Sequence, residues 1–471
     1  MNSKLQARPE RPDTVSGKMA AFAADLRYED LPDDVRERAK LVLLDALGCA
    51  LAGSATEDLR LIRQAMLGAA GPGGDSLLWG TAERAPLPMA ALANGAAIHA
   101  REMDDFEGCL HSGSVVIPAA FGTAVRAGCS GRELLTAIVL GYDIARRALE
   151  GCGGNLPLKD HGWHSTGICG GFGAAIATSR VLGLDARRMQ WALGFAGSNA
   201  GGTWAFIPDG AMSKRVHPGF AAQSGVVSAY LAASCVTGPT SIFEAEWGGF
   251  FPTYAGENAD AEKATENLGA DFRIRIVGFK PHAACRGSHG GIDAILELRR
   301  EHDLRPENVA RIVVRGSATH VKQLGKQEVQ TVLDAQFSLP YGIAVALTTG
   351  GAMLDQYSPQ ALRRPEIADL ARRIEVVQDE QVSGMQQPFV DVYLTDGRML
   401  TKRVLIPRGD RRNPVLEDEL RSKFRSNAGV ALGKSEVELL EETIARVDIL
   451  ENVSLMGSML VPDSRCQVQG A

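Results

Sequence analysis

The chain lacks several features that would place it in a membrane or outside the cell. It has no run of about 18 apolar residues, and a membrane-spanning helix needs one of that length. Residues 1–18 are polar and have no apolar core of the kind found in a secretory signal peptide. Positive charge is not in excess, because the formal net charge is −6, which argues against a general nucleic-acid binder. We therefore expect a cytoplasmic protein with no membrane span and no nucleic-acid partner.

Common hydrolase and nucleotide signatures are also missing. The eight cysteines form no CxxC pair, and without a secretion signal we expect reduced, mostly buried thiols. Neither GxSxG nor HExxH occurs, so serine-hydrolase and zincin chemistry have no support. Residues 162–173 (GWHSTGICGGFG) are rich in glycine, but they lack the GxGxxG spacing of a dinucleotide site and follow no expected strand.

What is present indicates a large helical domain. The 471 residues exceed one ordinary domain, so two domains are expected. Apolar residues recur every four positions over Pro32–Leu51 and predict a helix, with Asp33 or Asp34 as its cap. Between residues 87 and 270 strand-like alternation is nearly absent, and small-residue segments rich in glycine favour closely packed helices. The expected helices there include residues 134–147, 170–182 and 186–196, the last with Asp185 as its cap.

The pattern changes near Phe272 and indicates a smaller α+β domain. Phe272–Phe279 (FRIRIVGF) alternates with period two and predicts a strand, and Gly291–His302 predicts a helix. Residues 395–398 carry an Asp-Gly turn signal of the kind that joins the two strands of a hairpin. Further strands are predicted over Val309–Val314, Arg373–Val377 and Phe389–Leu394.

The last part of the chain returns to a helical pattern. A polar connector at residues 408–414 precedes it, and Ser435 with Glu438 forms a capping-box pattern before an expected helix over Val437–Leu450. We expect this tail to return to the first domain. The predicted fold is mainly α, with a discontinuous helical domain of residues 1–270 and 409–471 and an α+β lid domain of residues 271–408.

The densest chemical signal is the stretch 212–225 (MSKRVHPGFAAQSG). Lys214, Arg215 and His217 precede a Pro218-Gly219 break and a run of small residues. Three cationic or titratable groups in this setting are unfavourable unless they meet an anion, which points to a small carboxylate ligand. Lys214 could act as a base if burial lowers its pKa, or as a fixed positive charge. The alternative is an exposed Lys-Arg pair on the surface.

Two further clusters combine histidine with acids or with glycine. In residues 99–111 (HAREMDDFEGCLH) carboxylates beside histidine suit general acid–base work, or they cap helices in a solvated loop. His164 precedes two hydroxyl residues and several glycines. Backbone N–H groups at a helix start can bind an anion there, or the histidine is only structural.

The fourth cluster is residues 280–289 (KPHAACRGSH). His282, Cys285 and His289 have a spacing that would suit zinc, but a closed zinc site needs a fourth ligand and none is nearby. The better interpretation is a loop between a strand and a helix that presents Cys285, Arg286, Ser288 and His289 to a pocket.

Taken together, these segments resemble the MmgE/PrpD family, which includes 2-methylcitrate dehydratase, cis-aconitate decarboxylase and iminodisuccinate epimerase. The similarity runs through most of the chain in the family's order. The matching segments are LLDALGCALAG (43–53), HAREMDD (99–105), GWHSTGICGGFGAA (162–175), KRVHPGFAAQSG (214–225), KPHAACRGSHGGIDA (280–294) and AQFSLPYGIAVAL (335–347).

The resemblance implies an active site between a large helical domain and a smaller α+β lid domain. It implies a homodimer, no essential cofactor, no metal, and a small di- or tricarboxylate substrate. The residues expected to be catalytic are Lys214, His164, His111, Cys285 and Glu102. Those expected to bind substrate are Arg286, His289, Ser165 and Asp105.

Two departures from decarboxylase-type members bear on the reaction. Those members resemble DFDDT where this chain has EMDDF from Glu102 to Phe106, so an aromatic ring replaces a threonine hydroxyl. They also carry a histidine at the position of Cys285. A hydrogen-bonding group and a proton carrier have both changed, which argues against cis-aconitate decarboxylation.

The family's reactions share a proton transfer at a carbon alpha to a carboxylate, through a carbanion or enolate that cationic groups stabilise. Lys214 and Arg286 fit the stabilising role, and His164 or His111 could protonate a leaving hydroxide. We expect dehydration of a substrate like 2-methylcitrate first. Epimerisation of an iminodisuccinate-type substrate comes second, with Cys285 as a second base. Decarboxylation and a non-enzymatic helical binding module are the less favoured alternatives.

Overall fold

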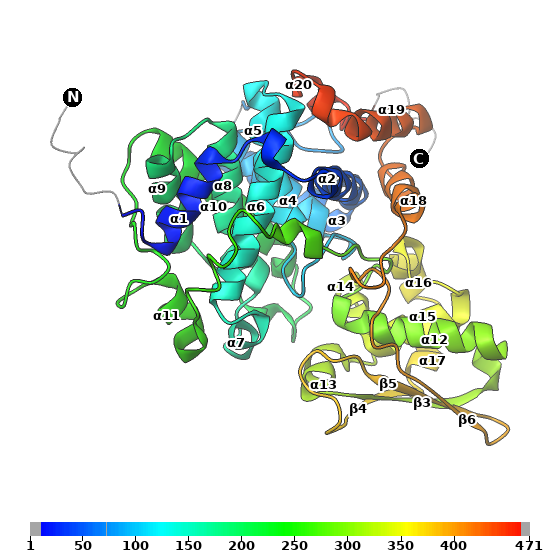
Figure 1. Cartoon of the computed structure of the whole chain (residues 1–471). Helices are drawn as coiled ribbons and strands as arrows, with labels where there is room; N and C mark the ends of the chain where they lie inside the picture. Colours follow the sequence, from blue (N-terminus) through cyan, green and yellow to red (C-terminus); the bar gives the residue numbers. More distant parts are fainter. Residues whose placement is uncertain (1–10, 72, 463–471) are drawn as a thin grey trace.

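Two sets of elements make up the fold, a large group of helices and a smaller group in which helices cover a sheet (Figure 1). The computed structural model describes residues 11–71 and 73–462. Residues 1–10, part of the segment on which the signal-peptide prediction rests, and Cys466 lie outside the described residues. The expected fold class, mainly α with a smaller α+β part, is confirmed.

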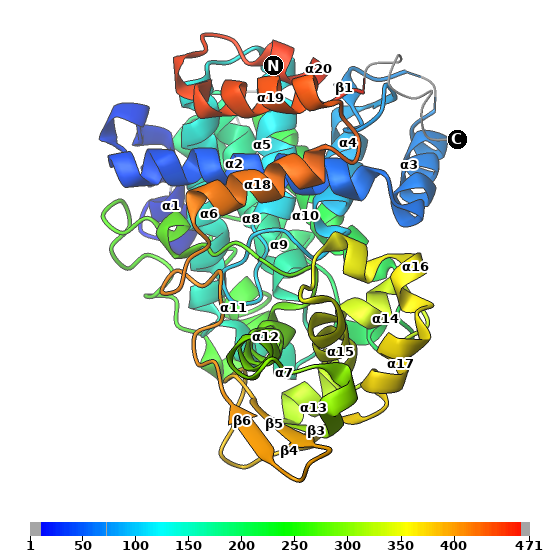
Figure 2. The same cartoon turned by 90° about the vertical axis from the view of Figure 1, so that its right-hand side faces the viewer.

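Helices from both ends of the chain form the large group, called the helical part below. They are α1 (Val15–Asp25), α2 (Asp33–Ser54), α3 (Glu57–Ala70), α4 (Leu87–His99), α5 (Gly113–Ala127), α6 (Gly131–Gly151), α7 (Asn155–Asp160), α8 (Ser165–Val181), α9 (Ala186–Ser198), α10 (Ser213–Ala233), α11 (Phe250–Ala255), α18 (Glu417–Ala428), α19 (Lys434–Ala445) and α20 (Ser454–Ser458). A short hairpin of β1 (Ser76–Leu77) and β2 (Arg84–Ala85) precedes α4. α8 is central and contacts α5, α6, α9 and α10. α18 lies along α2 (Figure 2), so the end of the chain returns to its first helices.

Small residues let the central helices approach closely, as the glycine-rich segments predict. A Cβ atom at Gly173 on α8 would lie 2.3 Å from the carbonyl oxygen of Gly141 on α6. A Cβ atom at Gly219 on α10 would lie equally close, at 2.3 Å, to the carbonyl oxygen of Leu92 on α4. Any larger residue would push these helices apart, so close packing requires glycine at both positions.

Contrary to the prediction, the Pro218-Gly219 pair does not interrupt the helix. α10 begins at Ser213 and continues through both residues. A proline inside a helix removes a backbone hydrogen bond and costs about 3 kcal/mol. The long contacts of α10 with α4 and α8 offset this cost. As a result Lys214 and Arg215 lie in the first turn and are buried, which excludes the exposed surface pair.

The smaller group, called the lid below, is a four-stranded mixed sheet with helices against it. The strand order is β4-β3-β5-β6, in which β3 is parallel to β4 and antiparallel to β5. The predicted Asp-Gly turn joins β5 to β6. The strands are β3 (Val309–Gly316), β4 (Ile374–Gln378), β5 (Phe389–Leu394) and β6 (Met399–Lys402). The helices are α12 (His289–His302), α13 (Ala318–Leu324), α14 (Val332–Gln336), α15 (Leu339–Thr349), α16 (Pro359–Leu362) and α17 (Pro365–Ala371).

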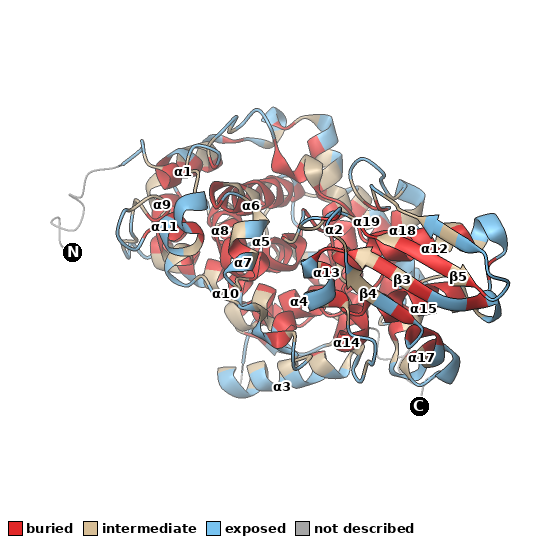
Figure 3. Ribbon diagram, turned by 90° about the horizontal axis from the view of Figure 1, so that it is seen from below, coloured by how far each residue is buried: buried red, intermediate tan, exposed pale blue. Residues whose placement is uncertain are grey.

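Most buried hydrophobic residues belong to one continuous core that extends from the helical part into the lid (Figure 3). They occupy the central helices of the helical part and the sheet with α12 and α15 in the lid. In β3 the buried residues include Val309, Ile312, Val314 and Gly316. α12 and α15 contact each other and the sheet, so the helical face of the sheet forms the core of the lid.

The segment 272–279 is not the strand that its alternation predicts. A 3₁₀ helix, η4 (Arg273–Ile276), packs there against α2 and α6. Within this described segment only Gly278 forms a strand-like pair, with Phe106 of the helical part. A strand is stable where a neighbouring strand and a pleated surface receive it, and this segment crosses a helical surface instead.

One predicted cap is confirmed and two are wrong. Asp185 caps α9 by accepting the backbone N–H of the third helical residue. Neither predicted aspartate caps α2, because its N-cap is a proline, and Asp34 forms an ion pair with Arg275. The N-cap of α19 is Gly433, so Ser435 lies inside the helix.

The seven cysteines of the described part are free thiols, of which three are buried, three half-buried and one exposed. No single helix within residues 11–71 and 73–462 has both the length and the apolar composition to cross a membrane. The bent pair of α2 and α3 meets these two criteria only when both helices are taken together.

Candidate active site

A cavity of about 600 Å³ lies between the helical part and the lid. Aromatic side chains form part of its wall, namely Phe106, Trp204 and Phe337. Residues from separate motifs meet around it. Six residues that the sequence predicts for the site line this cavity: Glu102, His111, His164, Lys214, Cys285 and Arg286.

Lys214 projects into this cavity from the first turn of α10, with 2% of its side chain exposed. Its Nζ atom forms an ion pair with Glu102 and lies 2.7 Å from Nε2 of His99. The centre of the Phe337 ring is 5.0 Å from the same atom. Burial lowers the pKa of Lys214 below its ordinary value, although Glu102 opposes the shift. A buried amine that loses its proton more easily is suited to act as a base.

Glu102 is a buried carboxylate shared by two lysines. Its Oε2 accepts a hydrogen bond from Nζ of Lys280 at 3.2 Å, and its other oxygen faces Lys214. Burial alone would raise its pKa, but Lys214 and Lys280 outweigh burial and hold the pKa of Glu102 well below its ordinary value. Its φ angle of 53° is left-handed, which costs a non-glycine residue about 1–2 kcal/mol. Strain of this kind is typical of side chains held in place for a function.

Lys280 lies beneath the cavity and differs from Lys214 in its charge state. It is fully buried, and its Nζ is 3.7 Å from a carboxylate oxygen of Asp104. Burial lowers the pKa of Lys280, but Glu102 and Asp104 outweigh burial and leave that pKa above its ordinary value. Lys280 is therefore a fixed cation, while Lys214 is the lysine that can exchange its proton.

His99 and Asp104 hold the amine of Lys214 from behind. Nδ1 of His99 lies 2.7 Å from a carboxylate oxygen of Asp104, and its Nε2 faces Lys214. Because a carboxylate only accepts hydrogen bonds, Nδ1 of His99 carries the proton and Nε2 accepts from Lys214. His99 and Glu102 thus accept two N–H groups of the amine. The remaining position on a neutral amine is its lone pair, which is free for the cavity.

His111 is fixed in one tautomer by the backbone. Its Nδ1 lies 2.9 Å from the carbonyl oxygen of Asp105, which can only accept, so Nδ1 carries the proton. Burial lowers the pKa of His111 to about 3, although Asp104 opposes the shift. The ring is therefore neutral at ordinary pH, and its Nε2 offers a lone pair to the cavity.

His164 is the N-cap residue of α8 and is also buried. Its ring packs against Trp204, with 5.1 Å between ring centres, and its Nδ1 lies 3.1 Å from Nδ1 of His217. Burial and the nearby Lys214 lower the pKa of His164 well below its ordinary value. This histidine is neutral as well.

Cys285 and Arg286 enter the cavity from the lid. Burial and the charge of Glu102 raise the pKa of the Cys285 thiol, so it holds its proton at neutral pH. The guanidinium of Arg286 lies over the ring of Phe106, 4.3 Å from its centre, and donates to the carbonyl oxygens of Pro407 and Arg408.

Arg286 remains a cation available to an anionic ligand. Burial lowers its pKa to about 10, which leaves it charged at neutral pH. Among the described residues no carboxylate lies within ion-pair distance of its guanidinium. An unneutralised guanidinium on a cavity wall is suited to bind a carboxylate in two-point contact.

Three predicted substrate contacts do not line the cavity. Ser165 donates to the carbonyl oxygen of Cys109 at 3.0 Å, and the carboxylate of Asp105 accepts from Tyr142 at 2.6 Å. His289 lies behind Arg286, 3.0 Å from its guanidinium, and its other ring nitrogen faces a backbone carbonyl. The structure therefore puts these residues in supporting positions, and direct substrate contact by them stays a prediction.

One cluster in the described residues brings three possible metal ligands together. Ligand atoms of His99, Asp104 and His111 lie within 4.8 Å of one another, and all three residues are buried. Asp104 already binds His99 and faces Lys280, while Lys214 occupies the other nitrogen of His99. A divalent cation would have to face two lysines, so the donor set fits an internal network of ion pairs better than a metal centre.

The residues that the zinc alternative would need point elsewhere. His282 bonds to Asp293 at 2.8 Å, and Cys285 lies 3.6 Å from the side-chain nitrogen of Gln323. In residues 11–71 and 73–462 their ligand atoms do not form a group with a third histidine or cysteine.

Sequence reasoning missed Lys280, His99 and Asp104 as members of the site. All three lie in the motifs HAREMDD and KPHAACRGSH, so their residue types were visible beside those selected. What the sequence did not reveal was their burial around one amine. A weak signal was available, because His99 and Asp104 stand in the same short motif as Glu102, only a few residues from it.

Comparison with known proteins agrees with this arrangement. A domain model described as the MmgE/PrpD N-terminal domain matches residues 17–262. A second, described as the MmgE/PrpD C-terminal domain, matches residues 282–449.

Full-length relatives are also found. A cis-aconitate decarboxylase of Aspergillus terreus is 28% identical over 97% of this chain and 98% of the relative. The cis-aconitate decarboxylase-like protein oryM of Aspergillus oryzae is 29% identical over 93% of this chain and 96% of the relative. The cis-aconitate decarboxylase of Homo sapiens is 26% identical over 95% of this chain and 94% of the relative. The chain therefore belongs to the MmgE/PrpD family and is an enzyme of the lyase type.

Proposed function

We propose that this enzyme removes a proton alpha to a carboxylate of a small hydroxylated di- or tricarboxylate and expels hydroxide, as a 2-methylcitrate dehydratase does. The observation that carries the proposal is the amine of Lys214, whose pKa burial lowers and whose hydrogens are held by His99 and Glu102. This geometry leaves one lone pair free for a C–H bond in the cavity.

Binding and charge stabilisation follow from the cations around the cavity. Arg286 has no carboxylate partner in the described residues and can hold one substrate carboxylate. Lys280 is fully buried and stays protonated behind Glu102, so its charge stabilises the enolate that forms when Lys214 takes the proton. Because these groups are already in place, they need little reorganisation during the reaction.

The leaving hydroxide requires a proton donor, and His164 suits this role better than His111. His111 must carry its proton on Nδ1, which faces a backbone carbonyl, so its Nε2 can only accept from the substrate. His164 can carry a proton on Nε2, because its Nδ1 can accept from His217. We assign His164 as the acid and His111 as the acceptor for a substrate hydroxyl.

Decarboxylation is the second candidate, because full-length relatives that are 26–29% identical bear the name cis-aconitate decarboxylase or a name like it. Phe106 and Cys285 on the cavity wall favour dehydration over decarboxylation. At these two positions the decarboxylase-type members that the chain resembles carry a threonine and a histidine instead. Epimerisation is less favoured, because a reversible two-base reaction needs the thiolate of Cys285 in one direction, and the raised pKa of Cys285 disfavours the thiolate.

A substrate panel in D₂O separates these reactions. The purified enzyme is incubated with 2-methylcitrate, citrate, cis-aconitate and iminodisuccinate, and products are followed by ultraviolet absorbance, proton NMR and CO₂ release. We expect a new C=C absorbance from 2-methylcitrate or citrate without CO₂. Release of CO₂ from cis-aconitate would favour decarboxylation instead. Deuterium at the alpha carbon without an alkene would favour epimerisation, and no reaction with any of the four compounds would overturn the proposed function.

A matched pair of variants ties the activity to the site. Lys214→Met keeps the length of the side chain and removes the base, so we expect kcat to fall by about 10² or more. Lys434→Met removes a lysine whose side chain is 90% exposed, and it should leave kcat unchanged. Equal activity of the two variants would exclude Lys214 as the base.

The expected homodimer also stays a proposal. Static light scattering on a sizing column measures the mass of the particle directly. A mass of twice 50.1 kDa is expected, and a mass of one chain would contradict the dimer.

A further inference from the structure

His217 lies on the far side of His164 from the cavity and joins it to a second hollow in the helical part. The two Nδ1 atoms are 3.1 Å apart, so one ring donates to the other. The ring of His217 also packs on Phe206, with 5.9 Å between ring centres, which restricts its orientation. The sequence singled out His217 beside Lys214, and the reaction derived above gives it no role beyond this contact.

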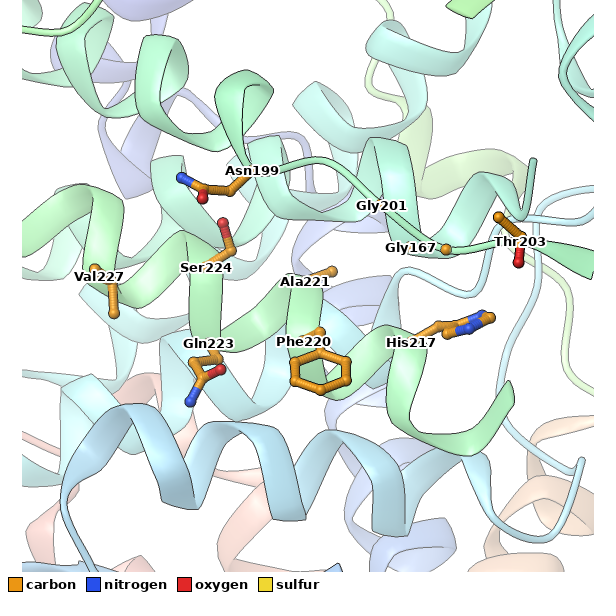
Figure 4. Close-up of a pocket in the computed structure, with 11 residues that line it drawn as sticks. Gly167, Asn199, Gly201, Thr203, His217, Phe220, Ala221, Gln223, Ser224 and Val227 are labelled. Atoms are coloured by element: carbon orange, nitrogen blue, oxygen red, sulfur yellow. The ribbon is translucent and has the colours of Figure 1, made fainter. Parts of the chain in front are cut away.

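The second hollow is a groove of about 580 Å³ along α10 (Figure 4). His217, Phe220 and Ser224 line it from α10, and Asn199 and Thr203 line it from the preceding segment. In Figure 4 the His217 side chain lies at one end of the groove, beside Gly167 and Thr203. The groove is separate from the cavity between the helical part and the lid, because their lining residues do not overlap.

Glycines keep the end of the groove open beside this ring. Gly202 has a φ angle of 130°, which L residues rarely adopt, and a Cβ atom there would come within 3.4 Å of the His217 ring. Its carbonyl oxygen accepts the backbone N–H of His164 at 3.1 Å. The same residue therefore holds the backbone of one histidine and leaves space beside the other.

The second nitrogen of His217 is free to meet solvent. Among the described residues nothing hydrogen-bonds its Nε2, and this atom is not buried. On the other ring, Nε2 of His164 likewise has no partner among the described residues and belongs to the cavity wall. The two hydrogen-bonded imidazole rings thus provide a path for protons from Nε2 of His164 at the cavity to Nε2 of His217 at the groove.

A neutral imidazole needs such a partner to act as an acid. The pKa of His164 lies well below its ordinary value, so its doubly protonated form is scarce at neutral pH. A neutral ring that gave up its Nε2 proton alone would become an anion, which is very unfavourable in a buried site. The loss becomes feasible if a proton arrives at Nδ1 in the same step.

We propose that His217 is a positioning and proton-relay residue that supplies this proton to His164 from solvent in the groove. As the leaving oxygen forms its O–H bond, the Nε2–H bond of His164 breaks. The Nδ1 proton of His217 moves to Nδ1 of His164, and a water in the groove gives a proton to Nε2 of His217. One hydroxide ion remains in the groove, so charge and protons balance.

The return step closes the cycle. After the product leaves, Nε2 of His164 receives the proton that Lys214 took from the substrate carbon. Nδ1 of His164 then returns its proton to His217, and His217 returns one to the hydroxide. The pair ends in its starting tautomer, and neither ring carries a net charge at either end of the cycle.

The relay rests on the proposed function, and kinetics test the two together. His217→Gln keeps a hydrogen-bonding side chain that cannot shuttle a proton, so we expect kcat to fall by about 10² with little change in KM. His217→Ala leaves space that opens to the groove, and added imidazole should restore part of its kcat. Gln223→Ala removes another groove residue that does not contact His164. It should keep its activity and show no response to imidazole.

An unchanged kcat in His217→Gln would overturn the relay. So would equal rises in KM and falls in kcat without imidazole rescue, since these indicate a structural role only. If wild-type enzyme acts on no polycarboxylate, the proposed function fails by itself.

A readout that needs no substrate then decides the relay. Nitrogen-15 NMR of histidine-labelled full-length protein measures how fast the ring N–H proton of His164 exchanges with solvent. We expect the ring proton of His164 to exchange more slowly in His217→Gln than in wild type. Equal exchange rates would overturn the relay whatever the substrate.

Discussion

Replacing Glu102 by glutamine tests the charge arrangement on which the site depends. The change keeps the size of the side chain and removes one negative charge. In the folded enzyme that charge faces both Lys214 and Lys280, and all three side chains are almost completely buried. The variant would therefore leave the buried ammonium group of Lys280, and that of Lys214 in its protonated form, without their shared counter-charge.

The expected loss of stability is large. Removing one partner of a buried ion pair costs about 3–5 kcal/mol, because the remaining charge stays desolvated. Glu102 has two such partners, so we expect the upper part of this range, reduced slightly because Asp104 still faces Lys280. A folded protein has a total stability of about 5–15 kcal/mol, so urea unfolding monitored by circular dichroism measures this loss easily.

The loss also depends on pH in a definite direction. In the wild type the pKa of Lys280 is raised, so its stabilising effect is complete below the ordinary value of 10.5 and disappears only above it. In Glu102→Gln, burial without the counter-charge lowers the pKa of both lysines. Between the lowered folded pKa and 10.5 the unfolded chain binds more protons, so the stability of the variant rises with pH. The difference from wild type should therefore shrink as the pH rises toward 10.5, mainly through Lys280, because the pKa of Lys214 is already lowered in the wild type.

A second buried glutamate five residues away provides the matched control. Glu107 accepts a hydrogen bond from Ser112, and burial raises its pKa to about 8, although Arg146 opposes the shift. Above its ordinary pKa of 4.5 the unfolded chain loses this proton while the folded protein keeps it, so the group lowers stability as pH rises toward 8. Glu107→Gln should therefore cost little near about pH 5 and stabilise the protein near pH 8.

Opposite results from the two variants are the signature of the proposed arrangement. A loss in Glu102→Gln of under about 1 kcal/mol, the size of an exposed ion pair, would refute the buried shared charge. A loss that does not change with pH would refute the unpaired lysines. Equal effects of Glu102→Gln and Glu107→Gln would show that burial alone explains both.

Three other variants test the roles of single residues or pairs. His99→Gln should lower kcat by about 10² with little change in KM, because Lys214 loses the acceptor that orients its lone pair. Steady-state kinetics measure both constants, and an unchanged kcat would contradict this role of His99. Arg286→Met should raise KM about tenfold or more, since a charged hydrogen-bonded contact with a carboxylate contributes about 1.5–3 kcal/mol, while the same kcat at saturation is expected. The double variant Phe106→Thr with Cys285→His, given cis-aconitate, should form more CO₂ relative to the product of water addition. Mass spectrometry and NMR measure this ratio, and an unchanged ratio would show that these two positions do not select the reaction.

Much of the fold was predictable because its signals are local. The α2 and α9 helices, the strands β3, β4 and β5 of the lid and the β5–β6 turn follow from periodicity, a cap at Asp185 and an Asp-Gly pair. The segment 272–279 shows the limit of this reasoning. Its alternation is that of a strand, but it crosses α2 and α6, where no strand edge is available.

The sequence predicted which residues belong to the site better than it predicted how they are arranged. The motifs pointed to Lys214, His164, His111, Glu102 and Cys285, and all five line one cavity. Periodicity did not reveal that His99, Asp104 and Lys280 set the pKa and orientation of Lys214 and Glu102, because this depends on contacts that form only in the folded chain.

The sequence by itself determined the residue types of the site and the elements that carry them, since helix, strand and turn signals act over a few neighbouring residues. Only the tertiary structure decided which lysine is a fixed cation and which can lose its proton. Lys214 and Lys280 are 66 residues apart, and their pKa values move in opposite directions because each meets a different set of buried charges. Likewise, only folding brings His164 and His217 within hydrogen-bond distance and sets one on the cavity and the other on the groove. Burial and distance, which set these properties, exist only once the chain has folded.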